Sequence, residues 1–346
     1  MKNKEMIVKK YPFSGKAINC FFDAEFTMID DLAKKEGLIF ITDENIFEKH
    51  PGKFFGRKTI VLKAGEQFKN QKTVDEAINQ LIELHADRQT FIVGVGGGVV
   101  TDIAGFIASV YMRGIKFAFM PTSILGMVDA SIGGKNGVDV GVFKNLVGTI
   151  NHPEFLLYDY SFLKTLPDEQ WVNGFAEIIK HACIKDKEMF VFLEANSLAK
   201  FQSSFSFMGK LIEKNVDIKY NVVANDEHET GDRKLLNFGH TIGHAIENAG
   251  KLPHGHAVSI GMVAACIISQ KTNGFEKADT KRVTALLSKY ELPVSLSFDK
   301  EKTWNILVHD KKKSGTDMNF VVLHEIGKSS VIKIPLNELL QIFNNL

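Results

Sequence analysis

The chain has 346 residues, of which 45% are hydrophobic, and this length and composition allow two packed domains. Its 42 Lys and Arg residues balance 41 Asp and Glu residues, and this near-neutral charge argues against a nucleic-acid partner. No apolar run reaches the roughly 18 residues that span a bilayer, and Cys20, Cys183 and Cys266 are too scattered for a disulfide framework. We therefore expect a cytoplasmic protein with no membrane partner.

The first half of the chain alternates strand-like and helix-like segments. Thr73, three residues before Glu76, resembles a capping box and predicts that a helix begins there. Short apolar runs predict strands at residues 38–41, 59–62, 90–93, 116–120 and 155–158. Such alternation is typical of an α/β, Rossmann-like domain, in which a parallel sheet carries helices on both faces.

After about residue 166, long helical patterns dominate the sequence. They cover residues 171–184, 208–223, 241–249 and 257–270, and only two strand-like pieces follow, near 320–323 and 331–334. We therefore predict a nucleotide-type α/β domain over residues 1–163 and a mainly α-helical domain over residues 164–346.

Two glycine-rich stretches mark candidate phosphate sites. The segment 94–102 (GVGGGVVTD) follows a predicted strand and opens a predicted helix, a context that favours a phosphate cradle over a tight structural turn. The segment 129–137 (DASIGGKNG) and the nearby Lys144 add basic side chains to flexible backbone. This second stretch fits an anionic ligand, and a surface loop with solvated lysines is the alternative.

Histidines gather in the second half, at His240, His244, His254 and His256. His240 and His244 stand four residues apart and share a helix face, so spacing alone nominates them as a pair of ligands for a divalent metal. Glu177 and Glu229 are the candidate carboxylate ligands. The alternative is that the histidines cap or pack helices.

Basic residues suited to an anionic substrate lie outside any clear amphipathic pattern. They are Arg113, Lys180, Lys219, Arg233 and the run 311–313. Each alone fits a solvated surface charge, but as a group they fit phosphate and carboxylate recognition.

Several motifs together resemble one known family. In order along nearly the whole chain stand GGGVVxD, YMRG, VDASIGGK, KNL, EIIK, LLNFGHTIGHA and HGxAV. The sequence is similar to the 3-dehydroquinate synthases, which are sugar-phosphate cyclases. The resemblance implies a homodimer, tightly held NAD, a divalent metal (zinc or cobalt), and an active site in the cleft between the two domains.

The resemblance also implies a role for each matching residue. The metal ligands would be Glu177, His240 and His254, which leaves His244 for the substrate and overrides the His240–His244 pair. The catalytic residues would be Asp129, Lys135, Lys180, Lys219, Arg233, Asn237 and His244. NAD would be held by Asp43, Asn45, Glu66, Lys69, Gly97, Gly98, Val99, Val100, Asp102, Thr122, Ser123, Lys135, Lys144 and Thr165. Substrate would be held by Asp129, Lys144, Asn145, Glu229, Lys311 or Lys312, and by Arg113 from the partner subunit.

The implied reaction, in the shikimate pathway to aromatic amino acids, converts 3-deoxy-D-arabino-heptulosonate 7-phosphate to 3-dehydroquinate and phosphate. It combines a transient oxidation by NAD with phosphate elimination, reduction and an intramolecular aldol closure. The rivals are a sister cyclase that forms an inosose or a valiolone, a polyol dehydrogenase, and a catalytically dead homologue. Asn237 and His244 favour dehydroquinate, because valiolone formers lose both. Thr101, Ser123 and His256 depart from the family pattern, in which His256 is usually Glu.

Overall fold

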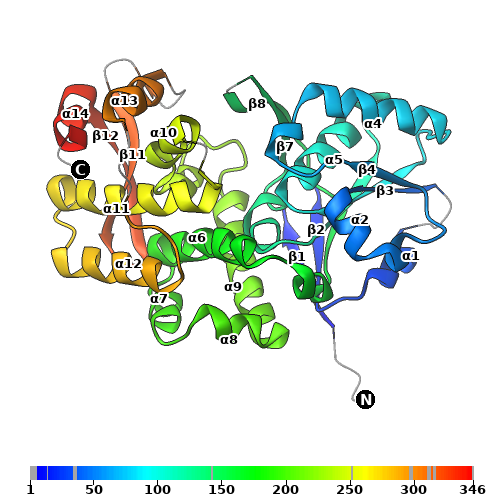
Figure 1. The fold of residues 1–346 in the computed structure, drawn as a ribbon, viewed down its shortest axis with the longest axis horizontal. Coiled ribbons are helices and arrows are strands. Elements are labelled where there is room, and N and C mark those ends of the chain that lie inside the picture. The colour runs from blue at the N-terminus through cyan, green and yellow to red at the C-terminus, as the bar shows by residue number, and fades with distance from the viewer. Residues whose placement is uncertain are drawn as a thin grey trace. The chain divides into compact units, whose positions relative to one another are not determined.

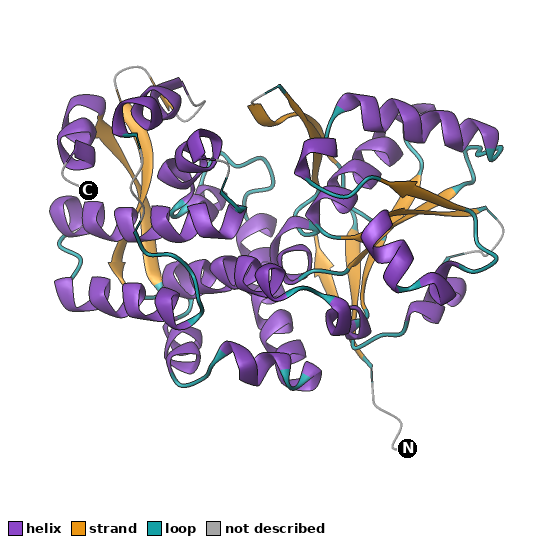
Figure 2. Cartoon of the chain, in the orientation of Figure 1, coloured by secondary structure: helices purple, strands orange, loops and turns teal. Residues whose placement is uncertain are grey.

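The computed structural model describes residues 6–13, 15–33, 37–141, 143–250, 252–295, 299–309, 313–314 and 317–344. Two compact units make up the chain. The first consists of Met1–Pro167 with Ser204–Tyr220, and the second of Asp168–Ser203 with Asn221–Leu346. Figure 1 follows the chain through them, and Figure 2 separates helices from strands.

A seven-stranded sheet forms the centre of the first unit. Its strand order is β1-β2-β9-β6-β5-β3-β4, and every neighbouring pair is parallel except β1 with β2. The strands are β1 (Ile7–Pro12), β2 (Ala17–Phe22), β3 (Leu38–Asp43), β4 (Thr59–Leu62), β5 (Phe91–Gly96), β6 (Lys116–Pro121) and β9 (Phe155–Tyr158). The five strands predicted from sequence are confirmed, and so is the Rossmann-like class; β1 and β2 were not predicted.

Both faces of this sheet are covered, as predicted. On one face Phe40, Val93 and Met120 join a core with Phe26 and Phe54. On the other face lies α5, and it lies close, because a Cβ added at Gly94 would sit 2.9 Å from the Ala104 Cβ. The helices and turns of this unit are η1 (Phe26–Met28), α1 (Ile29–Leu32), α2 (Glu44–Lys49), α3 (Pro51–Phe54), η2 (Glu66–Phe68), α4 (Gln71–Glu83), α5 (Gly98–Val110), η3 (Tyr111–Arg113), η4 (Gly126–Ala130) and η5 (Tyr160–Thr165).

Helix α4 begins two residues before the predicted start. Its N-cap is Asn70, whose Oδ1 accepts the backbone N–H of Thr73 at 3.1 Å. Thr73 is therefore inside the helix, and the capping-box prediction is wrong. Asn is as good a cap as Thr, and the residue that caps is decided by where the chain turns after β4.

The glycine-rich stretch after η4 continues into a β-hairpin. Its strands are β7 (Lys135–Val140) and β8 (Phe143–Ile150), paired antiparallel. Gly137 and Gly148 face each other across the pair, and a Cβ on Gly148 would lie 2.2 Å from the Asn136 carbonyl oxygen. These glycines allow the two strands to approach closely. From sequence alone, glycines with this role cannot be distinguished from glycines that make a loop flexible.

The unit boundary differs from the predicted one at residues 163/164. It falls after Pro167, and most of α9 (Phe205–Ala224) belongs to the first unit. Tyr11 of β1 explains this, since its ring stacks on Tyr220 at 4.0 Å and its hydroxyl donates to Asp217 at 2.5 Å. Sequence pattern assigned α9 to its neighbours in the chain, whereas its contacts assign it to the sheet.

The second unit is mainly helical, which confirms the predicted class. Its elements are α6 (Asp168–Lys185), α7 (Lys187–Glu194), α8 (Leu198–Gln202), η6 (Asp232–Asn237), α10 (His240–Gly250), α11 (His254–Asn273), α12 (Lys277–Lys289), α13 (Lys300–His309), α14 (Leu336–Asn344) and a small antiparallel sheet of β10 (Lys313–Ser314), β11 (Asp317–Glu325) and β12 (Lys328–Pro335). Across the described residues, no helix is long and apolar enough to cross a membrane.

Candidate active site

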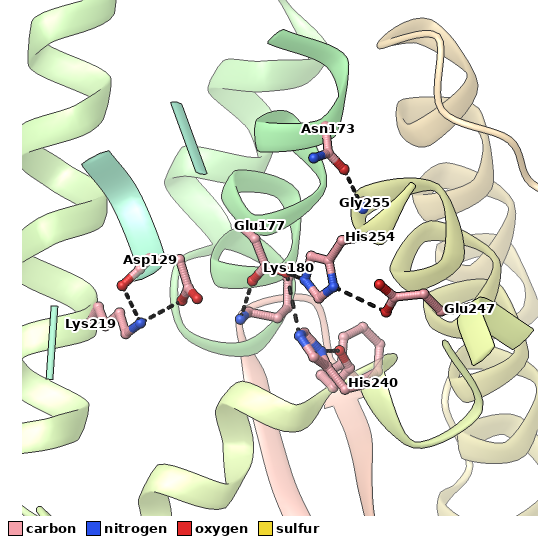
Figure 3. A network of polar contacts seen from close by, with 10 residues as sticks. Asp129, Asn173, Glu177, Lys180, Lys219, His240, Glu247, His254 and Gly255 are labelled. Carbon is pink, nitrogen blue, oxygen red and sulfur yellow. Dashed lines mark hydrogen bonds and ion pairs between the residues drawn. The ribbon is translucent and has the colours of Figure 1, made fainter. Parts of the chain in front are cut away.

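Three side chains of the second unit converge where α6, α10 and α11 meet (Figure 3). The Oε1 atom of Glu177 lies 3.4 Å from His240 Nε2 and 3.2 Å from His254 Nε2. The ligand atoms of these three residues all lie within 4.8 Å of one another. One carboxylate oxygen and two imidazole nitrogens are a donor set that suits zinc or cobalt and leaves coordination positions open. The residues present therefore fit a catalytic divalent metal.

Close helix packing brings these ligands together. His240 and His254 are the first residues of α10 and α11, and the two helices touch through glycine. A Cβ added at Gly261 of α11 would lie 1.9 Å from the Gly239 carbonyl oxygen and 2.8 Å from the Gly243 nitrogen. Gly239 itself has φ +77°, a left-handed conformation that glycine adopts without strain. Glycine at these places is thus a requirement of the histidine cluster.

Burial and charge keep the carboxylate of this set ionised. Glu177 is fully buried, and its Oε2 forms an ion pair with Lys180, which is also buried. Burial by itself would raise the pKa of Glu177, but the Lys180 ammonium and His240 hold this pKa well below its usual value. Burial lowers the pKa of His240. Both groups are therefore in the state that binds a metal, a charged carboxylate and a neutral imidazole.

A tight loop before η6 contains the candidate residue Glu229 and leads into η6, which contains Arg233 and Asn237. The Asp226 carboxylate accepts backbone N–H groups from Thr230 at 2.8 Å, Gly231 at 2.6 Å and Arg233 at 3.0 Å. Although the small burial of Asp226 opposes the shift, these N–H donors lower its pKa to about 2, so it is charged throughout the neutral range. The charged Asp226 holds together the loop that contains Glu229.

The turn η6 contains two polar candidate residues, Arg233 and Asn237. Arg233 is buried, with 3% of its surface exposed, and its Nη1 donates to the Glu227 carbonyl oxygen. Asn237 donates from Nδ2 to Glu229 Oε1 at 2.6 Å. The planar guanidinium suits phosphate and carboxylate groups, so Arg233 fits the predicted recognition of an anionic substrate.

The first unit holds a second group of candidate residues at the carboxyl ends of its parallel strands. The buried Lys69 ammonium lies 2.6 Å from Asp102 Oδ2 and donates to Asn145 Oδ1 at 2.6 Å. Burial would lower the pKa of Lys69, but Asp102 and Glu66 raise it to about 12. Lys144 lies 3.5 Å from Glu66 and joins this group.

The residues predicted to bind a dinucleotide lie near the same carboxyl ends of the parallel strands. β3 lies between β4 and β5, so the strand order reverses here, and a crevice at such a switch point is the usual nucleotide site. Asp43 ends β3, Gly97 is the N-cap of α5, and no side chain caps that helix, so its first N–H groups suit a pyrophosphate. Asn45 lies in α2, Val99 and Val100 lie in α5, and Thr122 and Ser123 follow β6. These residues fit NAD.

Asp129 and Lys219 are brought together within the first unit, from η4 and α9. The Lys219 ammonium donates to Asp129 Oδ1 at 2.8 Å and to the Asp129 carbonyl oxygen at 2.5 Å (Figure 3). Lys219 is largely buried. Two oxygens from one residue fix the ammonium in a single position.

Other predicted residues include Arg113, Thr165, His244 and Lys135. Arg113 is exposed in η3, and both it and Met112 have left-handed backbone, with φ of 67° and 49°. Thr165 bonds His50 through its hydroxyl at 2.7 Å. His244 is half-buried, 5.1 Å from the His240 ring. Lys135 is exposed at the start of β7. Lys311 and Lys312 lie outside the described residues.

Sequence reasoning missed two residues of this region. Glu247 on α10 accepts from His254, and Asp226 organises the loop of Arg233. Both are acidic residues in helical or loop sequence, where a solvated carboxylate is the usual finding. The signal for Glu247 was its place seven residues after His240 and three after His244, on the same helix face.

Solved structures with this fold include two synthases. The chain has a TM-score of 0.85 and 25% identity with a 2-deoxy-scyllo-inosose synthase in complex with carbaglucose-6-phosphate, NAD+ and Co2+, covering 98% of this chain and 100% of that one. It has a TM-score of 0.81 and 26% identity with a 2-epi-5-epi-valiolone synthase from Streptomyces hygroscopicus with NAD+ and Zn2+ bound, covering 91% and 93%. The fold is therefore similar to that of two synthases whose structures contain NAD+ and a divalent metal.

Family models and a relative narrow this class. The model described as 3-dehydroquinate synthase N-terminal matches residues 59–173, and the C-terminal model matches residues 174–313. A 3-dehydroquinate synthase from Leptospira interrogans is 39% identical over 320 residues, which are 89% of this chain and 88% of the relative. The chain belongs to the 3-dehydroquinate synthase family.

Proposed function

We propose that this enzyme converts 3-deoxy-D-arabino-heptulosonate 7-phosphate to 3-dehydroquinate and phosphate, as a cytoplasmic homodimer. One observation carries the proposal. The chain brings Glu177, His240 and His254 together in one unit, with the first two buried and His254 partly exposed, and it retains Asn237 and His244, the residues that favour dehydroquinate. A polyol dehydrogenase would need the metal set but not the buried Arg233 nor the fixed Lys219.

NAD would be held by the strand-end residues of the first unit and the metal by Glu177, His240 and His254. When bound, NAD would supply reversible hydride transfer and the metal would polarise a substrate oxygen. The protein's own side chains would contribute by keeping the binding groups charged and oriented. Lys180 keeps Glu177 ionised as a ligand, and Asp102 keeps Lys69 charged at the dinucleotide site.

Substrate recognition would rest on groups whose geometry is already constrained. Arg233, held by the Asp226 loop, would bind an anionic group, and Asn237 would meet a hydroxyl group after orientation by Glu229. Lys219, fixed by Asp129, would add a second cation. Substrate-binding roles for Lys135, Lys144, Asn145, Lys180 and His244 complete the proposal. Constrained donors lose little entropy on binding, which is how a site turns binding energy into rate.

A phosphate-release assay tests the function. Purified protein with NAD and zinc or cobalt is expected to release inorganic phosphate from the heptulosonate phosphate, with 3-dehydroquinate as the second product. Release only from sedoheptulose 7-phosphate or glucose 6-phosphate would refute the dehydroquinate assignment and favour a sister cyclase. The 39% identity to a dehydroquinate synthase, against 25–26% to the two sister synthases, supports the first outcome.

The homodimer proposal predicts complementation between two inactive variants. If Arg113 serves the partner's site, a dimer of Arg113→Ala with Lys219→Ala contains one intact site and one doubly defective site. An equal mixture, after subunit exchange, is then expected to recover about a quarter of wild-type activity, because about half of the dimers are mixed. The exposed, left-handed backbone at Arg113 supports a role beyond its own chain.

The measurement is the rate of the mixture against the rate of each variant alone. A mixture of Arg113→Ala with Arg113→Lys is the control. Both variants are changed at the same residue, so subunit exchange between them creates no intact site. A mixture no faster than its components, with exchange verified by native mass spectrometry, would show that Arg113 acts within its own subunit or not at all.

A further inference from the structure

His254 belongs to two overlapping groups of metal-ligand side chains. One is Glu177, His240 and His254, and the other is His244, Glu247 and His254. The ring uses a different nitrogen toward each, since Nε2 lies 3.2 Å from Glu177 Oε1 and Nδ1 lies 3.3 Å from Glu247 Oε2. One imidazole binds a given metal through one nitrogen, so the two carboxylates must have different roles.

The geometry selects Glu177 as the ligand. Its Oε1 lies within 3.4 Å of both His240 Nε2 and His254 Nε2, so two rings and a carboxylate converge on one place. Glu247 meets the opposite nitrogen of His254, on the side away from that place (Figure 3). It is therefore placed to hold the ring and not the ion.

We propose that Glu247 is a positioning residue for the metal site, accepting the Nδ1–H of His254 and thereby directing Nε2 toward Glu177 and His240. This inference rests on the metal site of the proposed function. Metal-binding histidines generally donate their second N–H to a carboxylate or carbonyl oxygen, which fixes the tautomer and strengthens the ligand.

The other parts of the site agree with this role. His240 is held in the same way, with Nδ1 3.1 Å from the Phe238 carbonyl oxygen, so both rings are restrained through Nδ1 and both present Nε2. Glu247 is buried, with 6% of its surface exposed. The backbone of His254 is restrained from α6, where Asn173 Oδ1 accepts the Gly255 N–H.

The test is a metal titration of the full-length chain after removal of metal by a chelator. Zn2+ affinity is measured by competition with a chromophoric chelator for wild type, Glu247→Ala, Glu247→Gln and the control Asn248→Ala, an exposed neighbour on α10. We expect the Kd of Glu247→Ala to rise about 10–100-fold. Glu247→Gln keeps an acceptor oxygen and is expected to lose less, and Asn248→Ala is expected to match wild type.

Co2+ absorption distinguishes positioning from ligation. Because the proposed ligands are unchanged, the saturated Co2+ spectra of both Glu247 variants are expected to match wild type. A changed spectrum in Glu247→Gln would overturn the proposal by making Glu247 a ligand, and wild-type Zn2+ affinity in Glu247→Ala would overturn it by removing any role. If the alanine variant does not fold, the same criteria apply to the glutamine variant. A wild-type chain that binds neither ion would refute the metal site itself, which is a separate result.

Discussion

Replacing His254 with alanine is expected to lower kcat/KM by about 10³-fold or more and to remove tightly bound metal. The change deletes one of three ligands, and it leaves Glu177 Oε1 without the ring that now lies 3.2 Å away. A metal that polarises a reacting oxygen contributes several kcal/mol to transition-state stabilisation, so its loss accounts for a large rate effect. Metal content after gel filtration and kcat/KM at saturating added zinc measure the two consequences.

His256→Ala is the matched control for this experiment. His256 stands two residues away in the first turn of α11, is half-buried, and has its pKa lowered by burial. It replaces the glutamate usual in the family pattern and belongs to neither group of candidate ligands. We expect His256→Ala to keep its metal. Full activity and full metal content in His254→Ala would refute the ligand assignment.

The sequence predicted the regular architecture because local pattern and global fold agree there. Apolar runs bounded by turn residues became β3, β4, β5, β6 and β9. The inner strands of this set, such as β9, are apolar because they are buried on both faces. Strand β1 was missed because it is mostly exposed at the edge of the sheet, and β2 was missed because its buried positions alternate with half-buried ones and form no continuous apolar run. The placement of α9 could not be predicted either, because it depends on the contact of Tyr11 with Tyr220, residues far apart in sequence.

The part of the site that was predicted from sequence is the part in which the residue type itself indicates the chemistry. Histidines and glycines stood out, and spacing on one helix suggested His240 with His244. In the structure the candidate groups join side chains from separate helices, and among the described residues no group contains both His240 and His244. Which carboxylate completes a set depends on tertiary packing. The residue pattern therefore left Glu177 and Glu229 as alternatives, only the family resemblance selected Glu177, and Glu247 was not named.

Replacing Gly261 with alanine is expected to destabilise the second unit by about 3 kcal/mol and to weaken metal binding with it. The new Cβ would lie 1.9 Å from the Gly239 carbonyl oxygen and 2.8 Å from the Gly243 nitrogen, both backbone atoms of the facing segment. Backbone cannot move aside as the end of a flexible side chain can, so α10 and α11 must separate. His240 and His254 begin these helices, and their separation would pull the two imidazoles apart.

Gly250→Ala provides the comparison, because this glycine lies in α10, the partner helix of α11, but meets nothing closer than Leu252 Cγ at 3.9 Å. An alanine there is expected to change stability by less than about 1 kcal/mol, and helix propensity favours it. Urea unfolding and Zn2+ titration of both variants measure the two effects together. Equal stability of the two variants would show that the helices do not need glycine contact. Loss of stability in Gly261→Ala without loss of Zn2+ affinity would show that the ligand geometry does not depend on the packing of α10 against α11.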